Sequence, residues 1–187
     1  MEFKKVLKGR RSVRRFSPKK VSNRTVLGAI KAALWAPSAG NVQDKEFVIV
    51  RDDKKKEELV SAVFDQVWVG RAPAIMVIIS DVNKLRLKFR ERAEFYATIS
   101  AGAAMQNMLL YLTEKGLQGT HVGLYDESKV KRLLNIPDSK RVFSIVALGY
   151  PAEKPPVPVR AEPKLITSLE SYGSKWVKGK PRHTYLE

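Results

Sequence analysis

Residues 72–80, APAIMVIIS, are apolar at almost every position, so an extended strand here would have no polar face. A strand of this kind is stable only inside a sheet that helices cover on both sides. The run VFSIVALGYP at 142–151 has the same character, and 46–50 and 119–125 are shorter candidates, the first expected to be a buried strand. Helical spacing separates these runs at 1–10, 22–36, 52–68, 94–116 and 127–137. This alternation predicts an α+β fold, a layered α/β domain whose sheet is sandwiched between helices.

Helix ends and one ambiguous segment carry more specific expectations. Ser22 or Asn23 is expected to cap the second helix, and Pro37 to stop it. The stretch 94–116 is apolar nearly all round and rich in small residues, which predicts a helix buried against a neighbour. In KLRLKFRER (84–92) apolar and basic residues alternate with the period of a strand. Two interpretations of 84–92 stay open: a half-buried edge segment, or an irregular lid over a pocket.

The last part of the chain changes in texture at Pro151. Five prolines fall within residues 151–163, which predicts an extended, semi-rigid arm. The arm still carries apolar side chains that need a surface, at Leu165, Ile166, Leu169, Tyr172 and Trp176. We therefore expect a domain over 1–150 and, over 151–187, a proline-rich arm of the same domain that packs on the partner subunit of a homodimer. The alternative is a tail folded back on its own core.

Composition excludes several classes of protein. The chain has no cysteine, which removes disulfides and thiolate metal sites, and it has only two histidines, too few for a three-histidine metal site. His121 is expected to be a satisfied structural histidine, and His183 to be solvated. No apolar run is long enough to cross a membrane, and no secretory signal is apparent, so a cytoplasmic protein without a bound metal is expected. The sparse acid–base equipment favours a cofactor that carries its own chemistry.

The charge is strongly basic and unevenly placed. The formal net charge is +16, and residues 1–24 hold ten basic side chains against one acid. Such a field attracts nucleic acids, nucleotides and phosphorylated cofactors alike. Lysine richness without cysteine is also typical of thermophile proteins, in which much of the charge is functionally silent.

The motif RRSVR at 10–14 follows a short amphipathic helix at the start of the chain, whose apolar face is expected to dock, so its arginines are expected to be held in place. In an extended segment Arg10, Ser12 and Arg14 share one face. Two guanidinium groups and a hydroxyl suit the oxygens of one phosphate. Nucleic acid usually requires a longer basic stripe with aromatic residues or a recognition helix.

Two loops add possible contacts to a flat ligand. In APSAGNVQ (36–43) small residues allow close approach, and the amides of Asn41 and Gln43 can meet the edge of a heterocycle. Gly123 precedes a helix cap in GTHVGLYDES (119–128), where backbone N–H groups can face an oxygen or a ring nitrogen.

Taken together, these pieces resemble the nitroreductase family of FMN-dependent NAD(P)H oxidoreductases. The resemblance runs from about residue 5 to residue 176. It rests on RRSVR (10–14), AALWAPSAGNVQ (32–43), DQVWVGRAPAIMVI (65–78), GAAMQNMLL (102–110), GTHVGLYDESKVKRLLNIP (119–137) and VALGYPAEKP (146–155). The combination of PSxxNxQ with RRSxR is its most specific part.

The resemblance implies a mixed sheet between helices, an intertwined homodimer, and two FMN sites at the subunit interface. Arg10, Ser12 and Arg14 match residues that hold the phosphate and ribityl chain, and the loop with Ser38 matches one that reaches the flavin from the partner subunit. A basic residue of the arm, Arg160 or Lys164, would complete the phosphate site. The implied cofactor-binding set is Arg10, Arg11, Ser12, Arg14, Pro37, Ser38, Asn41, Gln66, Gly123, Leu124, Arg160 and Lys164.

The implied reaction is ping-pong hydride transfer from NADH or NADPH, through flavin N5, to a small oxidant such as a nitroaromatic, a quinone or a flavin. No catalytic side chain is required, and Arg14 would supply positive charge near the pyrimidine edge. The chain departs from the family at Ser100, where an acid is common, and at His121, where an aromatic is frequent. Alternatives are a dehalogenase or dehydrogenase branch of the same family, or a basic nucleic-acid-binding protein.

Overall fold

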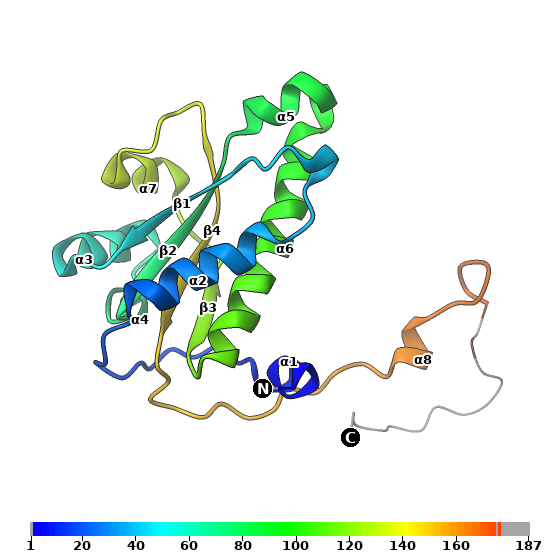
Figure 1. Ribbon diagram of the computed structural model, residues 1–187, viewed down its shortest axis with the longest axis horizontal. Coiled ribbons are helices and arrows are strands. Elements are labelled where there is room, and N and C mark those ends of the chain that lie inside the picture. The colour runs from blue at the N-terminus through cyan, green and yellow to red at the C-terminus, as the bar shows by residue number, and fades with distance from the viewer. Residues whose placement is uncertain (1, 175, 177–187) are drawn as a thin grey trace. The chain divides into compact units, whose positions relative to one another are not determined.

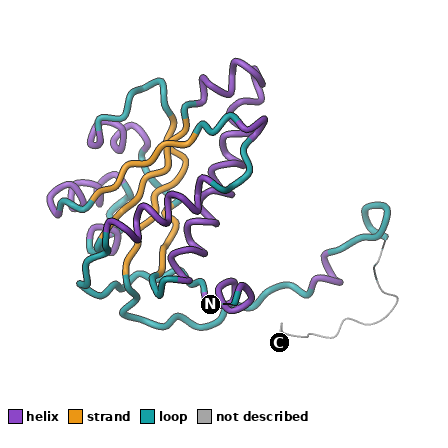
Figure 2. Tube along the Cα trace, in the orientation of Figure 1, coloured by secondary structure: helices purple, strands orange, loops and turns teal. Residues whose placement is uncertain are grey.

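The computed structural model describes residues 2–174 and 176 of the chain, which divides into two units, Met1–Pro155 and Pro156–Glu187. The first unit is built on a four-stranded sheet in the order β1-β2-β4-β3. Its strands are β1 (Lys45–Val50), β2 (Ala74–Ser80), β3 (Gln118–Val122) and β4 (Arg141–Gly149). Figure 1 shows this sheet between helices, and Figure 2 sets its strands apart from the helical layers by colour. The predicted layered fold with a covered sheet is confirmed.

Two groups of helices cover the two faces of the sheet. One face is covered by α2 (Asn23–Leu34) and α6 (Ala93–Glu114). The other is covered by α3 (Asp53–Ala62), α4 (Val67–Gly70) and α7 (Glu127–Leu134). The shorter helices of this unit are α1 (Phe3–Gly9), α5 (Val82–Phe89), and the 3-10 turns η1 (Ala39–Asn41) and η2 (Arg90–Arg92).

Strand β2 is buried along its whole length, as its apolar sequence predicts. Met76 and Ile78 pack into the core beneath α2 and α6, whereas Ile75 and Val77 pack beneath α3 and α7. Both faces are thus apolar because a helical layer lies against each. Since burial of one such side chain contributes about 1.5–3 kcal/mol, this strand supplies much of the apolar burial on both sides of the sheet.

Strand directions and the place of β1 differ from the expectation. Every pairing among the described strands of this chain is antiparallel, whereas a mixed sheet was expected. Strand β1 lies at an edge, and Val50 alone among its residues is fully buried, so the expectation of a buried strand at 46–50 is wrong. An edge strand has a neighbouring strand on one side only, so many of its residues stay half exposed.

The segment 84–92 is helical, so the edge-strand interpretation is wrong, and so is the irregular backbone expected of a lid. A position over a pocket stays a prediction. Val82 and Leu85 are fully buried and three residues apart, which is the spacing of one helix face. Leu87 is 91% exposed. Its apolar side chain between basic neighbours produced the alternation that resembled a strand.

The two long helices of one layer follow their sequence signals closely. Ser22 is the N-cap of α2, since its hydroxyl accepts a hydrogen bond from the backbone N–H of Thr25 (3.1 Å), and the helix ends before Pro37. In α6 the small residues Ala97, Ala101 and Ala104 are buried. The opposite face of α6 is open in the single chain, with Ile99 55% exposed, so this nearly all-apolar helix is buried on one side only.

Within its described residues, the second unit contains one short helix, α8 (Pro163–Ile166), and several large apolar side chains that are exposed. They are Val157, Val159, Leu165, Ile166, Leu169, Tyr172 and Trp176. His183 lies outside the described residues. Among the residues that the structure describes, no helix is long and apolar enough to cross a membrane.

A buried charge pair joins the start of β1 to its surroundings. The Lys45 ammonium lies 2.5 Å from the Asp44 carboxylate and 2.7 Å from the Ser100 hydroxyl on α6, and Ser80 also donates to Asp44. Asp44 is only 1% exposed, and burial lowers the pKa of Lys45. Ser100, noted above as a departure from the family, therefore has a structural partner.

Replacing Lys45 with Met should destabilise the fold by about 3–5 kcal/mol, because it leaves the Asp44 charge buried and unpaired. The measurement is the free energy of unfolding by urea. The double variant Lys45→Met/Asp44→Asn should recover most of the lost stability. Lys54→Met, at an exposed position of α3, should change the free energy of unfolding by less than about 0.5 kcal/mol. Equal losses in Lys45→Met and Lys54→Met would contradict a structural role for the pair.

Candidate functional site

The arginine-rich segment after α1 is extended and fixed by side chains from distant parts of the chain. The backbone N–H of Arg11 donates to the Gln118 side chain (2.8 Å), and the Thr120 hydroxyl donates to the Val13 carbonyl (2.6 Å). Glu153 accepts from the backbone N–H of Arg14 (2.5 Å). These anchors hold the segment against β3 and the end of β4.

Side chains alternate along this segment as an extended backbone requires. Val13 is fully buried, whereas Ser12 and Arg14 are exposed. Arg10 is half-buried and has contacts of its own within the described chain. The Arg11 guanidinium turns back to the carbonyls of Lys8 (2.6 Å) and Arg10 (2.8 Å) at the end of α1. Ser12 and Arg14 thus share an open face, and a role for Arg11 in cofactor binding stays a prediction.

Glu153 shapes this face without neutralising Arg14. Its carboxylate accepts from the backbone of Arg14 and Arg15 and pairs with the Arg15 side chain at 3.3 Å. The two backbone N–H groups are the main cause of its lowered pKa. The Arg14 guanidinium instead lies over the Trp68 ring, 5.8 Å from the centroid, in a cation–π contact. Within the described residues, no acidic side chain pairs with it.

Trp68 and Gln66 connect the arginine segment to the turn after β3. Trp68 is half-buried on α4, and Gln66 is the N-cap position of that helix. The Gln66 amide donates to the carbonyls of Val63 (2.9 Å) and Leu124 (3.4 Å). Helix α4 therefore joins parts of the chain that are far apart in sequence, because Arg14 contacts its Trp68 and Leu124 bonds to Gln66 at its N-cap.

The loop before Gln66 is strained. Phe64 and Asp65 both have positive φ angles, of 53° and 57°, a region that residues with a side chain rarely adopt. Such strain persists where surrounding structure imposes it, and it clusters at functional sites. Here it fixes the direction in which α4 presents Gln66 and Trp68.

The turn at Gly123 and Leu124 offers unpaired backbone donors. Both residues are exposed, and neither N–H donates to another residue that the structure describes. His121, on β3, is also exposed and makes no hydrogen bond within the described part of the chain, so the expectation of a satisfied structural histidine is wrong. Desolvation by neighbouring atoms lowers the pKa of His121, which favours a neutral imidazole at pH 7.

The loop 36–43 forms a second predicted cluster. Gly40, Asn41 and Gln43 all have left-handed backbones, and the Ser38 hydroxyl accepts from the Gln43 N–H (3.3 Å). Asn41 and Pro37 are exposed. The loop packs against α5, where the Lys88 ammonium lies 3.5 Å from the Gly40 carbonyl.

The register of the sheet places the two clusters at opposite ends. The loop 36–43 leads into Lys45, which pairs with Ser80 at the end of β2. The arginine segment instead lies beside Pro151, just beyond the end of β4 that pairs with the start of β2. Figure 1 shows α1 near one end of the sheet and α5 near the other. One chain therefore does not bring Pro37, Ser38 and Asn41 to Arg14.

The remaining predicted residues, Arg160 and Lys164, lie in the second unit. Both are exposed, and Arg160 donates to the neighbouring Val159 carbonyl (3.3 Å). Their part in a phosphate site stays a prediction.

Sequence reasoning missed the residues that hold the site together. The arginine segment is anchored by Gln118, Thr120 and Glu153, which lie more than one hundred residues away in the chain. No local spacing in the sequence predicts such contacts. Trp68 lies within DQVWVGRAP, a stretch too ordinary on its own to mark a site.

The first cluster has the features that a phosphorylated flat cofactor such as FMN requires. It combines a cationic face with a hydroxyl, an indole ring, and two unpaired N–H donors. Within the described residues, no group of three His, Cys, Asp or Glu side chains could hold a metal ion.

Comparison with known proteins identifies the family of this chain. The sequence model of the nitroreductase family matches residues 7–81 and 65–150. The chain is similar to an NADH dehydrogenase of Thermus thermophilus, with 31% identity over 78% of this chain and 84% of that protein. An iodotyrosine deiodinase of Thermotoga neapolitana is 30% identical over 80% of this chain and 88% of its own length.

A solved structure, NADPH:FMN oxidoreductase from Vibrio harveyi in complex with NAD+, shares the fold. Its TM-score is 0.82 at 24% identity, covering 91% of this chain and 77% of that one. The order of elements, the clusters at both ends of the sheet and these matches lead to one conclusion: the chain belongs to the nitroreductase family.

Proposed function

We propose that this chain is an FMN-dependent NAD(P)H oxidoreductase that works as a homodimer and reduces a small acceptor by a ping-pong reaction. The observation that carries the proposal is the cluster in which Arg14 lies over Trp68 while Gln66 bonds to Leu124. This cluster unites residues that the family resemblance assigns to the flavin. The names of the related proteins, which include an NADH dehydrogenase and an NADPH:FMN oxidoreductase, support the cofactor and the donor.

The side chains of this cluster bind and orient. Arg10, Ser12 and Arg14 would hold the phosphate and the adjoining polar chain of FMN. The N–H groups of Gly123 and Leu124 would donate to the edge of its ring system. When bound, FMN would supply the two-electron redox chemistry between NAD(P)H and the acceptor, with solvent as the source of protons. Arg14 would add fixed positive charge where negative charge develops.

The separation of the two clusters within one chain supports the proposed homodimer. A two-fold partner can bring its own loop 36–43 to the arginine segment, because each copy carries one of each at opposite ends of the sheet. Exposed apolar residues are available for this contact, with Trp35 87% and Ile99 55% exposed. The proline-rich arm has similar exposed residues, including Ile166 (73%), and we assign it to the partner's surface.

A second candidate is reductive dehalogenation by the same bound flavin. It is favoured by the relative named iodotyrosine deiodinase. Release of iodide from iodotyrosine under reducing conditions, at a rate comparable with nitroaromatic reduction, would place the chain in that branch.

The purified protein should be yellow, with flavin absorption at about 450 nm, and should oxidise NADH or NADPH when a quinone or nitroaromatic is supplied. Absorption spectra and steady-state kinetics with both donors check this expectation. A colourless protein that takes up no FMN in excess and co-purifies with nucleic acid would favour the nucleic-acid-binding alternative.

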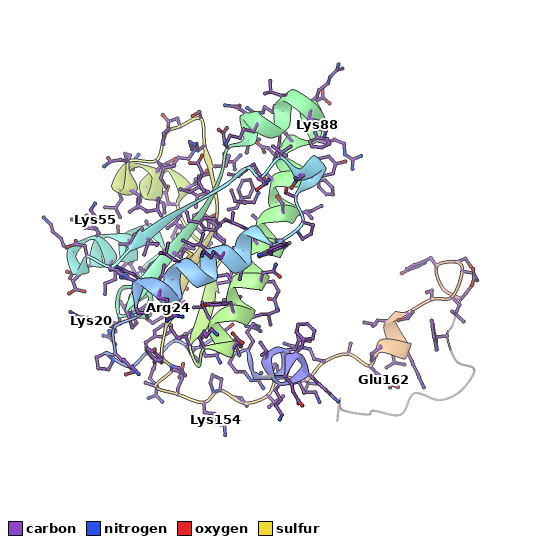
Figure 3. All side chains as sticks on the ribbon, viewed as in Figure 1. Lys20, Arg24, Lys55, Lys88, Lys154 and Glu162 are labelled. Carbon is purple, nitrogen blue, oxygen red and sulfur yellow. The ribbon has the colours of Figure 1, made fainter. Side chains whose placement is uncertain are left out.

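The double variant Arg10→Ala/Arg14→Ala should raise the dissociation constant of FMN by about 100-fold or more, because two charged hydrogen bonds to the phosphate are lost. Fluorescence titration of the apoprotein with FMN measures it. Lys20→Ala/Arg24→Ala removes the same charge from two exposed positions, one before α2 and one in its first turn, both labelled in Figure 3. This double variant should change the affinity for FMN less than about threefold. Similar losses of FMN affinity in both double variants would contradict a phosphate site at Arg10 and Arg14.

Ile99→Glu should convert the dimer to monomer and lower flavin content, since the charge would be buried in the interface. Sedimentation and the ratio of flavin to protein absorbance report the two effects. Ser61→Glu, on the exposed face of α3, serves as the control and should leave both unchanged. A flavin-loaded dimer with Glu at position 99 would contradict this interface.

A further inference from the structure

The helix α5 and the turn η2 form a wall directly beside the loop 36–43. An added Cβ at Gly40 would lie 2.5 Å from the Lys88 ammonium and 3.1 Å from the Phe89 ring. Ala39 and Val42 of the loop pack in the same small apolar cluster as Phe89. The loop is therefore bordered by the end of α5, from which the chain continues directly into η2. Figure 3 labels Lys88 on this wall.

The wall is strongly basic, and most of its charge is not neutralised. Residues 84–92 contain five basic side chains and one acidic side chain, Glu91, which is exposed. Arg86 is 3.5 Å from Glu94, which also pairs with Arg141 at 2.9 Å. Lys88 and Arg92 form no ion pair with any residue that the structure describes, and both are exposed.

Aromatic rings lie beside these cations. Phe89 and Tyr96 pack at 4.8 Å between centroids, and Phe95 lies 5.7 Å from Tyr96. The Arg92 guanidinium is 5.3 Å from the Tyr96 centroid and 5.5 Å from that of Phe95. The Lys88 ammonium is 5.7 Å from the Phe89 ring. Flat apolar surface with adjacent cations suits a ligand that is aromatic and negatively charged.

The backbone between the two elements is strained at Arg90, whose φ and ψ angles are 48° and −123°. A residue with a side chain is rarely found there, and such strain is retained where it has a use. It turns the chain sharply between α5 and η2, so that Lys88 and Arg92 flank the same aromatic group.

We propose that Lys88 and Arg92 select an acceptor that is an aromatic carboxylate or a similar aromatic anion, with Phe89, Phe95 and Tyr96 contacting its ring. The proposal rests on the proposed function, since the acceptor is the oxidant of that reaction. Reduction itself is unchanged by it. The wall contributes only the recognition of charge and ring together.

Binding of a redox-inert pair tests the wall without turnover. Benzoate and benzamide have nearly the same shape and differ in charge, and isothermal titration calorimetry measures their affinity for the flavin-loaded protein. We expect benzoate to bind about tenfold more tightly than benzamide. Lys88→Gln and Arg92→Gln should each weaken benzoate about fivefold and leave benzamide unchanged.

A matched control removes one positive charge elsewhere. Lys55, labelled in Figure 3, is an exposed residue of α3, and Lys55→Gln should leave the affinity for benzoate unchanged. Equal affinity for benzoate and benzamide in the unaltered protein would overturn the proposal. So would a loss of benzoate affinity in Lys55→Gln as large as in Lys88→Gln, because the effect would then be general charge attraction.

Turnover separates this inference from the proposed function. With 4-nitrobenzoate and 4-nitrobenzamide as acceptors, the ratio of their kcat/KM values should fall about fivefold in Lys88→Gln but not in Lys55→Gln. If both compounds are reduced and the ratio is the same in every variant, the inference fails while the proposed function stands. If neither compound is reduced by any variant and a quinone is not reduced either, the proposed function fails, and the benzoate titration still decides whether the wall binds aromatic anions.

Discussion

The antiparallel pairing of β2 with β4, covered on both faces, is the constraint on which the rest of the structure depends. Ile75, Met76, Val77 and Ile78 are each fully buried, alternately under one helical layer and the other. Because a one-residue slip would exchange the two faces of the strand, the packing fixes the register of the sheet. The register then determines which loops meet at each end, and so where a site can form.

At one end of the sheet, anchors from distant sequence convert an arginine-rich segment into a fixed surface. Gln118, Thr120 and Glu153 hold its backbone by hydrogen bonds. The arrangement leaves Ser12 and Arg14 facing outward with Trp68 beneath the guanidinium. A surface fixed in this way loses little conformational entropy when it binds an anion, which favours tight binding.

At the other end, the loop 36–43 and the basic, aromatic wall of α5 and η2 lie together. In the proposed two-fold dimer, one end of each copy would meet the opposite end of the other, so the proposed cofactor binding and acceptor selection would belong to one site. The basic residues at the two ends would then have separate local roles.

Sequence alone determined the elements whose signals are local. Ser22, Pro37 and the periodicity of α2 define a helix by hydrogen bonds and sterics within a few residues. The apolar run of β2 required two covering layers, and the alternation of residues 10–14 required an extended backbone with Ser12 and Arg14 on one face. The family resemblance rested on motifs of the same local kind.

Tertiary structure decided what depends on neighbours distant in the chain. The position of Leu87 gave residues 84–92 the alternation of a strand, but the segment is helical because this places Val82 and Leu85 together in a packed cluster. His121 became exposed, and β1 half-buried, because each took a place at the margin of the fold that its own residues do not encode. The anchors at Glu153 and Thr120, and the separation of the two clusters, follow from strand order. Strand order is set by the total free energy of packing, which no short stretch of sequence contains.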